Sequence, residues 1–253
     1  MNIENRLQLA VQSFWDGRAS NLANQKERGT IDAGTRGAVT AGTQMGGLEV
    51  LIADILCEAG LKELDVKART GLELPGYYRP EKRWDLIVVS EGQLVLAMEF
   101  KSMVGSFGKN ANNRFEEAVG NAKDIWTAFR EGRFGDSPTP FLGYFFLLED
   151  QAEVHAPRSN AEPYFVVDPI FKTGEGRGRR SASGVSYGKR FEILCRRLVL
   201  ERLYTATCLV LSTNENPTRI TQPADDLSFQ RFVAGLRGHA RTFLESQSGR
   251  PKS

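Results

Sequence analysis

Two carboxylates and a lysine stand at the ends of short apolar segments whose pattern is typical of β-strands. Asp85 lies at the start of the segment 84–89, and Glu99 and Lys101 lie on either side of Phe100. Side chains alternate along a strand, so Glu99 and Lys101 point to one face and Phe100 points to the other. If Asp85 begins the neighbouring strand, the three charged groups can share one site. Two carboxylates suit a hard cation such as Mg²⁺, and a lysine beside it can orient or activate a water molecule.

The same residues also fit a strand end held by salt bridges, with no chemistry, and strand register separates these two interpretations. For Asp85 and Glu99 to meet, they must lie opposite each other, and the numbers of paired residues then sum to 184. Ser90 then faces Leu94 across a three-residue loop, Glu91-Gly92-Gln93. A two-residue turn would separate the acids unless a β-bulge restored the register. We therefore predict an odd-length loop or a bulge, with one face that carries Val95, Ala97, Glu99 and Lys101 beside Asp85, Ile87 and Val89.

Hydrophobic spacing predicts the elements that position these residues. Helices are expected over 2–27, 48–60, 113–130, from Phe191 onward and over 227–245, and strands over 63–70, 84–89, 94–100, 141–148 and 205–211. Two glycine-rich segments, 29–47 and 172–190, are predicted to be mobile loops, and 246–253 a flexible tail. This order predicts one α/β domain over 1–253, with a mixed β-sheet flanked by helices.

Composition narrows the class of protein. Hydrophobic residues make up 41% and charged residues 25%, which is ordinary for a folded water-soluble protein. No apolar run is long enough to cross a membrane, the first residues lack a signal-peptide cleavage pattern, and three unpaired cysteines suit a reducing compartment, so we expect a cytoplasmic protein. Two histidines are too few for a histidine-rich zinc centre, and a net charge of +2 does not by itself indicate nucleic-acid binding.

The acidic motif resembles that of the PD-(D/E)xK nuclease superfamily, with Trp84 in place of the proline before Asp85 and with Glu99-Phe100-Lys101 as its second half. Further segments resemble the XhoI-type restriction endonucleases: Gly76-Tyr77-Tyr78-Arg79-Pro80, Lys82, Phe107-Gly108-Lys109-Asn110, Asn112-Asn113-Arg114 and Glu116-Glu117-Ala118. The resemblance implies a restriction-endonuclease-like core and a magnesium-dependent type II enzyme. It also implies a homodimer that cuts double-stranded DNA at the palindrome CTCGAG and leaves 5′-phosphates.

Under this resemblance, Asp85 and Glu99 bind Mg²⁺ together with the backbone carbonyl of Phe100, and Lys101 positions the attacking water. Glu49, on the helix before the sheet, is a candidate further ligand, because many members of the superfamily place an extra acid there. Its alternative role is a solvated charge on the helix surface. A companion DNA methyltransferase that acts separately on the same site is expected, since a host must protect its own DNA.

Contacts to DNA are expected from basic and amide side chains outside the acidic motif. Asn112, Asn113 and Arg114 either cap the following helix or contact a phosphate. Arginines in glycine-rich segments can track phosphates or read guanine edges, and the alternative is a solvated loop. These candidates are Arg36, Lys172, Arg177, Arg179, Arg180, Lys189 and Arg190. Two other functions remain open: a repair or recombination nuclease that recognises DNA structure, and a DNA-binding module with an inactive site.

Overall fold

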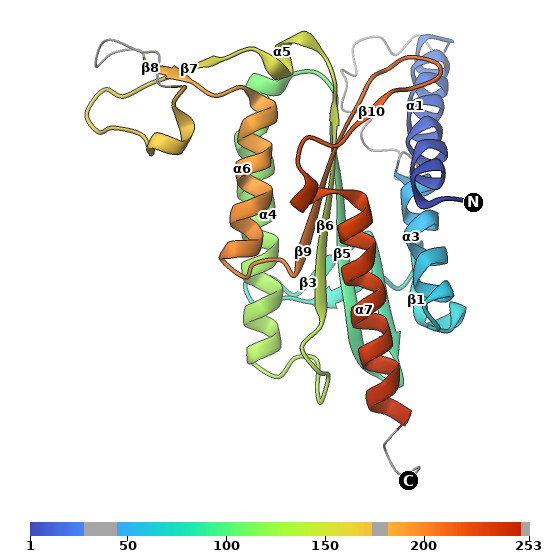
Figure 1. Cartoon of the computed structure of the whole chain (residues 1–253). Coiled ribbons are helices and arrows are strands. Elements are labelled where there is room, and N and C mark those ends of the chain that lie inside the picture. The colour runs from blue at the N-terminus through green and yellow to red at the C-terminus, as the bar shows by residue number, and fades with distance from the viewer. Residues whose placement is uncertain (28–44, 174–181, 249–253) are drawn as a thin grey trace.

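A six-stranded mixed β-sheet runs through the centre of the computed structural model, which describes residues 1–27, 45–173 and 182–248 (Figure 1). The strands lie in the order β1-β4-β5-β6-β9-β10. The β5–β6 and β6–β9 pairs are parallel, and the other three pairs are antiparallel. The bounds are β1 Val66–Lys67, β4 Leu86–Ser90, β5 Gln93–Met103, β6 Phe141–Glu149, β9 Ala206–Ser212 and β10 Ile220–Thr221.

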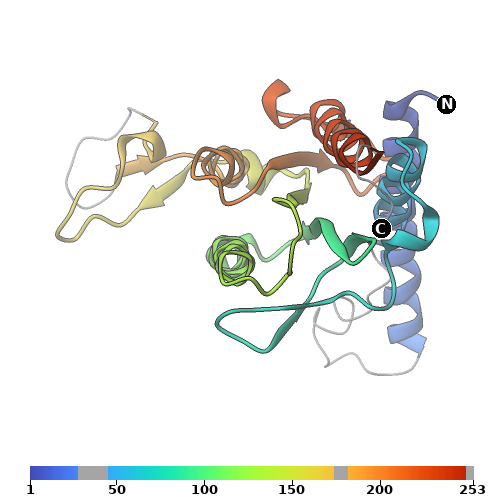
Figure 2. The same ribbon diagram turned by 90° about the horizontal axis from the view of Figure 1, so that it is seen from below.

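Helices cover both faces of this sheet (Figures 1 and 2). Helices α1 (Ile3–Glu27), α3 (Gly46–Glu58) and α7 (Phe229–Ser248) pack on one face, and α4 (Phe107–Arg130) and α6 (Tyr187–Leu200) pack on the other. The predicted α/β class, with a mixed sheet flanked by helices, is confirmed, and the architecture is consistent with a restriction-endonuclease-like core. Within the described residues, no helix is both long enough and apolar enough to span a bilayer.

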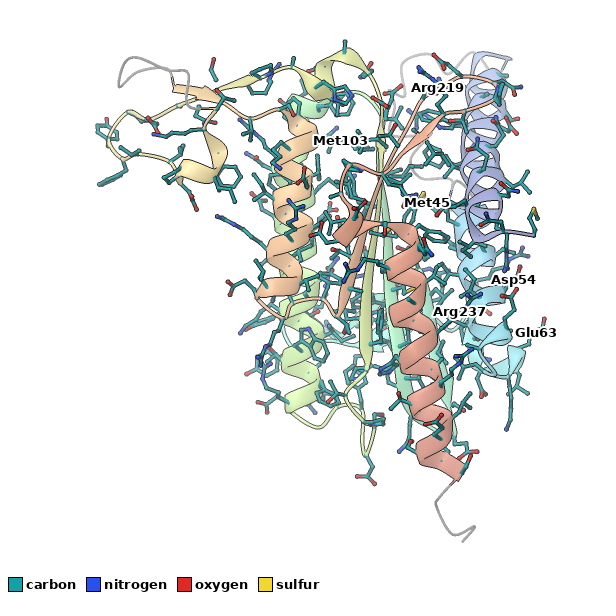
Figure 3. The ribbon with its side chains drawn as sticks, in the orientation of Figure 1. Met45, Asp54, Glu63, Met103, Arg219 and Arg237 are labelled. Atoms are coloured by element: carbon teal, nitrogen blue, oxygen red, sulfur yellow. The ribbon has the colours of Figure 1, made fainter. Side chains whose placement is uncertain are left out.

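Each helix layer has its own apolar core because β5 and β6 are buried on both faces, as expected for central strands. Leu86, Val88 and Met98 pack toward α1, α3 and α7, whereas Ile87 and Ala97 pack toward α4 and α6. Ion pairs at the surface join the helices of the first layer. Arg237 of α7 reaches Glu58 at the end of α3 (3.0 Å), and Arg6 of α1 pairs with Glu58 and Asp54. Figure 3 labels Arg237 on α7 and Asp54 on α3.

The hairpin of β4 and β5 contains a bulge, one of the two arrangements that the sequence predicted. Its turn is the tight Glu91-Gly92 pair, with both residues at positive φ, so Ser90 faces Gln93 and the predicted three-residue loop is wrong. A bulge on β5 at Val95 then shifts the register, and from Val88 onward toward Leu86 the paired numbers sum to 184.

The bulge changes one predicted side-chain direction. Val95 packs in the α1, α3 and α7 layer together with Leu96, not on the face of Ala97, because the extra residue interrupts the alternation of the strand. The paired register ends at Leu86 and Met98, and Asp85, the next residue, bonds through its backbone N and its carboxylate to Met98 and Phe100, the two neighbours of Glu99. The prediction of an odd-length loop or a bulge is therefore confirmed by the bulge.

Several element boundaries differ from those predicted. Helix α4 begins at Phe107 instead of 113, the predicted strand 63–70 is a 3₁₀ turn (Glu63–Asp65) followed by two-residue β1, and α7 continues to Ser248, into the predicted tail. The predicted loop 172–190 contains β8 (Ala182–Gly184) and the start of α6, whose N-cap Ser186 accepts a hydrogen bond from the backbone N of Lys189 (3.3 Å). The glycine-rich composition of this segment predicted a loop and did not indicate β8 or the start of α6.

Two antiparallel hairpins outside the main sheet were not predicted, because each strand has only three residues. Strands β2 (Glu73–Pro75) and β3 (Glu81–Arg83) form one hairpin that reaches α4. Strands β7 (Arg158–Asn160) and β8 form the second, on an arm that projects from α6 (Figures 1 and 2). The remaining short elements are α5 (Ala152–His155) and 3₁₀ turns at Pro169–Phe171 and Asp225–Leu227.

Candidate active site

Glu99 lies between two lysines on the α4 side of the sheet. Its carboxylate, whose side chain is 3% exposed, forms ion pairs with Lys101 on the same strand and with Lys82 on β3. Asn121 of α4 donates a longer hydrogen bond to the same carboxylate (3.4 Å). Burying one carboxylate is costly unless it has charged or hydrogen-bonding partners, and here both oxygens have them.

The lysines keep Glu99 ionised. Burial alone would raise the pKa of Glu99, but Lys101 and Lys82 outweigh burial and hold its pKa below the ordinary value. For Lys101, burial is likewise outweighed, and the carboxylates of Glu99 and Asp85 raise its pKa. For Lys82, burial prevails over the attraction of Glu99, so its pKa is lowered. Of the two lysines, Lys101 therefore holds its proton more tightly.

Asp85 lies immediately before β4, an inner strand between β1 and β5. Its carboxylate accepts a hydrogen bond from the backbone N of Phe100 (2.7 Å), and its own backbone N donates to Met98 O (3.2 Å). Because the N–H and C=O of one residue in an extended strand point to the same side, the carbonyl of Phe100 also faces the Asp85 side. Burial and the nearby Glu99 raise the pKa of Asp85.

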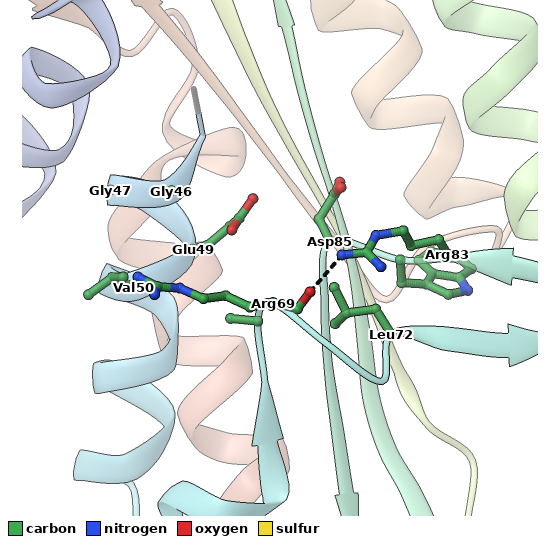
Figure 4. Close-up of a pocket in the computed structure, with 10 residues that line it drawn as sticks. Gly46, Gly47, Glu49, Val50, Arg69, Leu72, Arg83 and Asp85 are labelled. Atoms are coloured by element: carbon green, nitrogen blue, oxygen red, sulfur yellow. Dashed lines mark hydrogen bonds between the residues drawn. The ribbon is translucent and has the colours of Figure 1, made fainter. Parts of the chain in front are cut away.

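A pocket of about 690 Å³ opens beside Asp85, with Glu49 of α3 on its other wall (Figure 4). Burial, followed by repulsion from Asp85, raises the pKa of Glu49 to about 7. Two arginines also line the pocket. Arg83 donates hydrogen bonds to the carbonyl of Arg69 (2.6 Å; dashed in Figure 4) and to the carboxylate of Glu73 (2.9 Å).

The donor set suits a hard divalent cation. Asp85, Glu99 and the Phe100 carbonyl are oxygen donors, and burial raises the pKa values of Asp85 and Glu49, so a cation bound here would favour their ionised forms. Within the described residues, no group of three or more Asp, Glu, His or Cys side chains forms a ready-made metal cage. An ion here would therefore be held by two carboxylates, a backbone carbonyl and water molecules.

The predicted residues of α4 lie inside the helix, so the expectation that they cap its start is wrong. Asn112 and Asn113 are exposed in the second turn, and Arg114 pairs with Glu117. The carboxylate of Glu117 contributes to the raised pKa of Lys101, which places this pair near the acidic site.

The other predicted DNA contacts lie away from the acids or outside the described residues. Lys172 pairs with Glu162 (2.8 Å) on the β7–β8 arm, and at the start of α6 Lys189 pairs with Glu192 (2.7 Å). Arg190 donates to the side chain of Asn160 on β7 (3.0 Å). The candidates Arg36, Arg177, Arg179 and Arg180 fall outside the described residues.

Sequence reasoning assigned no role to Lys82, Asn121, Arg69 or Arg83. Lys82 also lies over the ring of Trp84, 4.0 Å from its centroid. The available sequence signal for Lys82 was its spacing from Trp84. Side chains two residues apart in an extended segment point to the same side. Nothing local indicated that this segment crosses next to Glu99.

Comparison with known proteins agrees with this geometry. The family model described as restriction endonuclease XhoI matches residues 24–222. The chain is 41% identical over 225 residues to the type II restriction enzyme BstVI of Geobacillus stearothermophilus. The matched region covers 86% of this chain and 96% of that protein. It is 44% identical over 196 residues to the type II restriction enzyme XhoI of Xanthomonas vasicola, covering 76% and 74% of the two chains. It is also 44% identical to the type II restriction enzyme AbrI of Azospirillum brasilense, over 64% of this chain and 73% of the relative. No solved structure matches the chain significantly. The chain therefore belongs to the XhoI restriction endonuclease family.

Proposed function

We propose that this protein is a type II restriction endonuclease that makes double-strand breaks at CTCGAG by magnesium-dependent hydrolysis, leaving 5′-phosphates. The observation that supports the chemistry is that Asp85 accepts a hydrogen bond from the backbone N of Phe100, which lies between Glu99 and Lys101, and that the side chains of these two residues form an ion pair. The recognition sequence rests on the resemblance to the XhoI-type enzymes alone.

In this proposal, Asp85, Glu99 and the carbonyl of Phe100 hold Mg²⁺, and Glu49 adds a carboxylate from the opposite wall of the pocket. When bound, the ion stabilises the negative charge that builds on the attacked phosphate. Lys101 orients the attacking water, because its ammonium pairs with Glu99 while its side chain stays one-quarter exposed.

The basic side chains would serve the substrate. Arg69 and Arg83 line the pocket next to Asp85, where they can neutralise phosphates on either side of the scissile bond. Arg36, Lys172, Arg177, Arg179, Arg180, Lys189 and Arg190, together with Asn112, Asn113 and Arg114, remain proposed contacts to more distant parts of the duplex.

A palindromic site calls for two symmetric copies of the reader, so we further propose a homodimer that acts in the cytoplasm beside a separate methyltransferase. Sedimentation of the protein alone and on a CTCGAG duplex tests the assembly. A monomer in both states would contradict a symmetric type II enzyme.

The test of function is digestion of a plasmid of known sequence with MgCl₂. We expect discrete fragments that end at CTCGAG. Cutting that depends on branches or ends would support a repair nuclease instead, and binding without cutting would support an inactive module.

Single alanine variants test the roles. Asp85→Ala, Glu99→Ala and Lys101→Ala should each abolish cleavage while circular dichroism and most of the DNA affinity are retained. Glu116→Ala, an exposed carboxylate on α4, serves as the control and should cut normally. Near-normal cleavage by any of the three site variants would overturn the assignment.

A further inference from the structure

The turn Gly76–Pro80 joins β2 to β3 and presents two tyrosines to solvent. The exposed fraction is 48% for Tyr77 and 67% for Tyr78, and the two rings meet edge to face with centroids 4.9 Å apart. Large aromatic side chains that stay this exposed side by side are typical of interaction surfaces. The proposed catalytic site does not use them.

A buried carboxylate holds this turn in shape. Asp124 of α4, whose side chain is 5% exposed, accepts hydrogen bonds from the backbone N of Tyr77 (2.8 Å), the backbone N of Tyr78 (2.9 Å) and Nε of Arg79 (2.7 Å). At Gly76, a Cβ atom would lie 2.6 Å from the carbonyl of Arg79 and 2.8 Å from Asp124, so this position admits only glycine. The tyrosines are therefore exposed from a fixed scaffold.

The turn is also connected to the candidate active site by a few residues of one strand. From Arg79, β3 leads within three residues to Lys82, which contacts Glu99, and then to Arg83, which lines the pocket with Asp85. At about 3.3 Å per residue, Arg79 lies on the order of 10 Å along the chain from Lys82, whose side chain reaches Glu99. A duplex with a phosphate at Asp85 would have neighbouring nucleotides within that range.

The charge beside the tyrosines fits the same partner. A shallow depression of about 480 Å³ at the tip is lined, among the described residues, by Arg79 and Arg133 and by no acid. The side chain of Arg79 is 42% exposed although it pairs with Asp124, and Arg133 is exposed. Positive charge beside flat apolar rings matches the phosphate and deoxyribose wall of a DNA groove.

We propose that the Gly76–Pro80 turn is a preformed DNA contact, in which the rings of Tyr77 and Tyr78 pack against a groove wall next to the scissile phosphate. This inference rests on the proposed nuclease function and locates a contact that the acidic site alone does not provide. Asp124 acts as a positioning residue that keeps the turn in its binding shape.

The test compares a Tyr77→Ala/Tyr78→Ala double variant with the wild type, using fluorescence anisotropy of a labelled CTCGAG duplex in CaCl₂ over a range of salt concentrations. We expect the affinity to fall by about tenfold or more, the scale of losing aromatic contacts to nucleotides. The salt dependence should keep its slope, since no charge is removed. A Leu64→Ala variant, which truncates a residue that is 69% exposed elsewhere, is the control and should bind normally.

Further variants separate the possible contributions. Tyr77→Phe/Tyr78→Phe should bind like the wild type, because the rings and not the hydroxyl groups make the contact. Asp124→Asn should weaken binding with both tyrosines present, provided that its thermal unfolding shows a folded protein. Gly76→Ala is a second way to displace the turn if Asp124→Asn does not fold.

Three results would overturn the inference: unchanged affinity of the double alanine variant, an equal loss in the phenylalanine variant, or a change in sedimentation in place of a change in DNA affinity. Failure of the proposed function is distinguishable from each of these. In that case the wild type itself neither binds nor cuts duplex DNA.

Discussion

Glu49 is expected to destabilise the metal-free protein at neutral and alkaline pH. Its pKa is raised from an ordinary 4.5 to about 7, first by burial and then by Asp85. Below about pH 4.5 the carboxyl is protonated in both the folded and the unfolded chain, and it has no effect on stability. As the pH rises from about 4.5 to about 7, the Glu49 carboxyl loses its proton first in the unfolded chain. The free energy of unfolding therefore falls until both states are ionised above about pH 7.

The size of this effect follows from the difference between the two pKa values, which corresponds to about 3 kcal/mol. Glu49 is partly exposed, and solvent screening reduces the figure to roughly 1–2 kcal/mol. Glu49→Gln removes the charge and keeps the shape of the side chain. The variant should therefore be more stable than the wild type by that amount at pH 8, and no more stable at pH 4.5.

The assay is urea denaturation with EDTA at several pH values between 4.5 and 8. In MgCl₂ the wild type should regain most of its deficit in unfolding free energy relative to the variant, because an ion bound at these carboxylates stabilises the folded state by mass action. Plasmid cleavage by the variant should fall, and the control Glu116→Gln should show neither effect. A constant stability difference at all pH values, or destabilisation at pH 8, would refute the reasoning.

Variants at three other positions test the supports of the site. Lys82→Met leaves Glu99 with one lysine and should lower stability by about 1–3 kcal/mol and impair cleavage, whereas Lys82→Arg should retain more of both, as measured by urea titration and plasmid digestion. His239→Ala removes the imidazole that contacts the carbonyl of Val95 at the bulge (2.9 Å) and should cost about 1–2 kcal/mol. Burial lowers the pKa of His239, so wild-type stability should fall as the pH drops below about 6.5, and the variant should lack that component. Gly143→Ala places a Cβ atom 3.1 Å from Met98 and 3.2 Å from Phe232, and calorimetry should show about 1–3 kcal/mol of destabilisation from overpacking.

The register of β4 and β5 shows how far sequence reasoning could reach. The requirement that Asp85 meet Glu99 predicted an odd loop or a bulge, but it could not choose between them. The tight Glu91-Gly92 turn and the bulge occur together, and His239, distant in sequence, contacts the carbonyl of the bulged Val95. A contact between α7 and β5 depends on how the helices pack, which no local pattern records.

Residues far apart in the chain account for the rest of the site. Glu49 had two interpretations, a metal ligand or a solvated charge, until the packing of α3 placed it across a pocket from Asp85. Lys82 and Asn121 reach Glu99 only because the β2–β3 hairpin and α4 cross the same face of the sheet.

The amino-acid sequence by itself determined the long helices, the central strands and the chemistry of their side chains. Apolar spacing predicted the α/β class and the central strands, and alternation placed Glu99 and Lys101 on one face, because both follow from geometry within a few residues. Only the tertiary structure decided which groups surround Glu99, that the β4–β5 hairpin has a two-residue turn with a bulge instead of a three-residue loop, and that the Gly76–Pro80 turn rests on Asp124. Burial and charge pairing are properties of segments brought together by packing, and the energies that select them are summed over the whole fold.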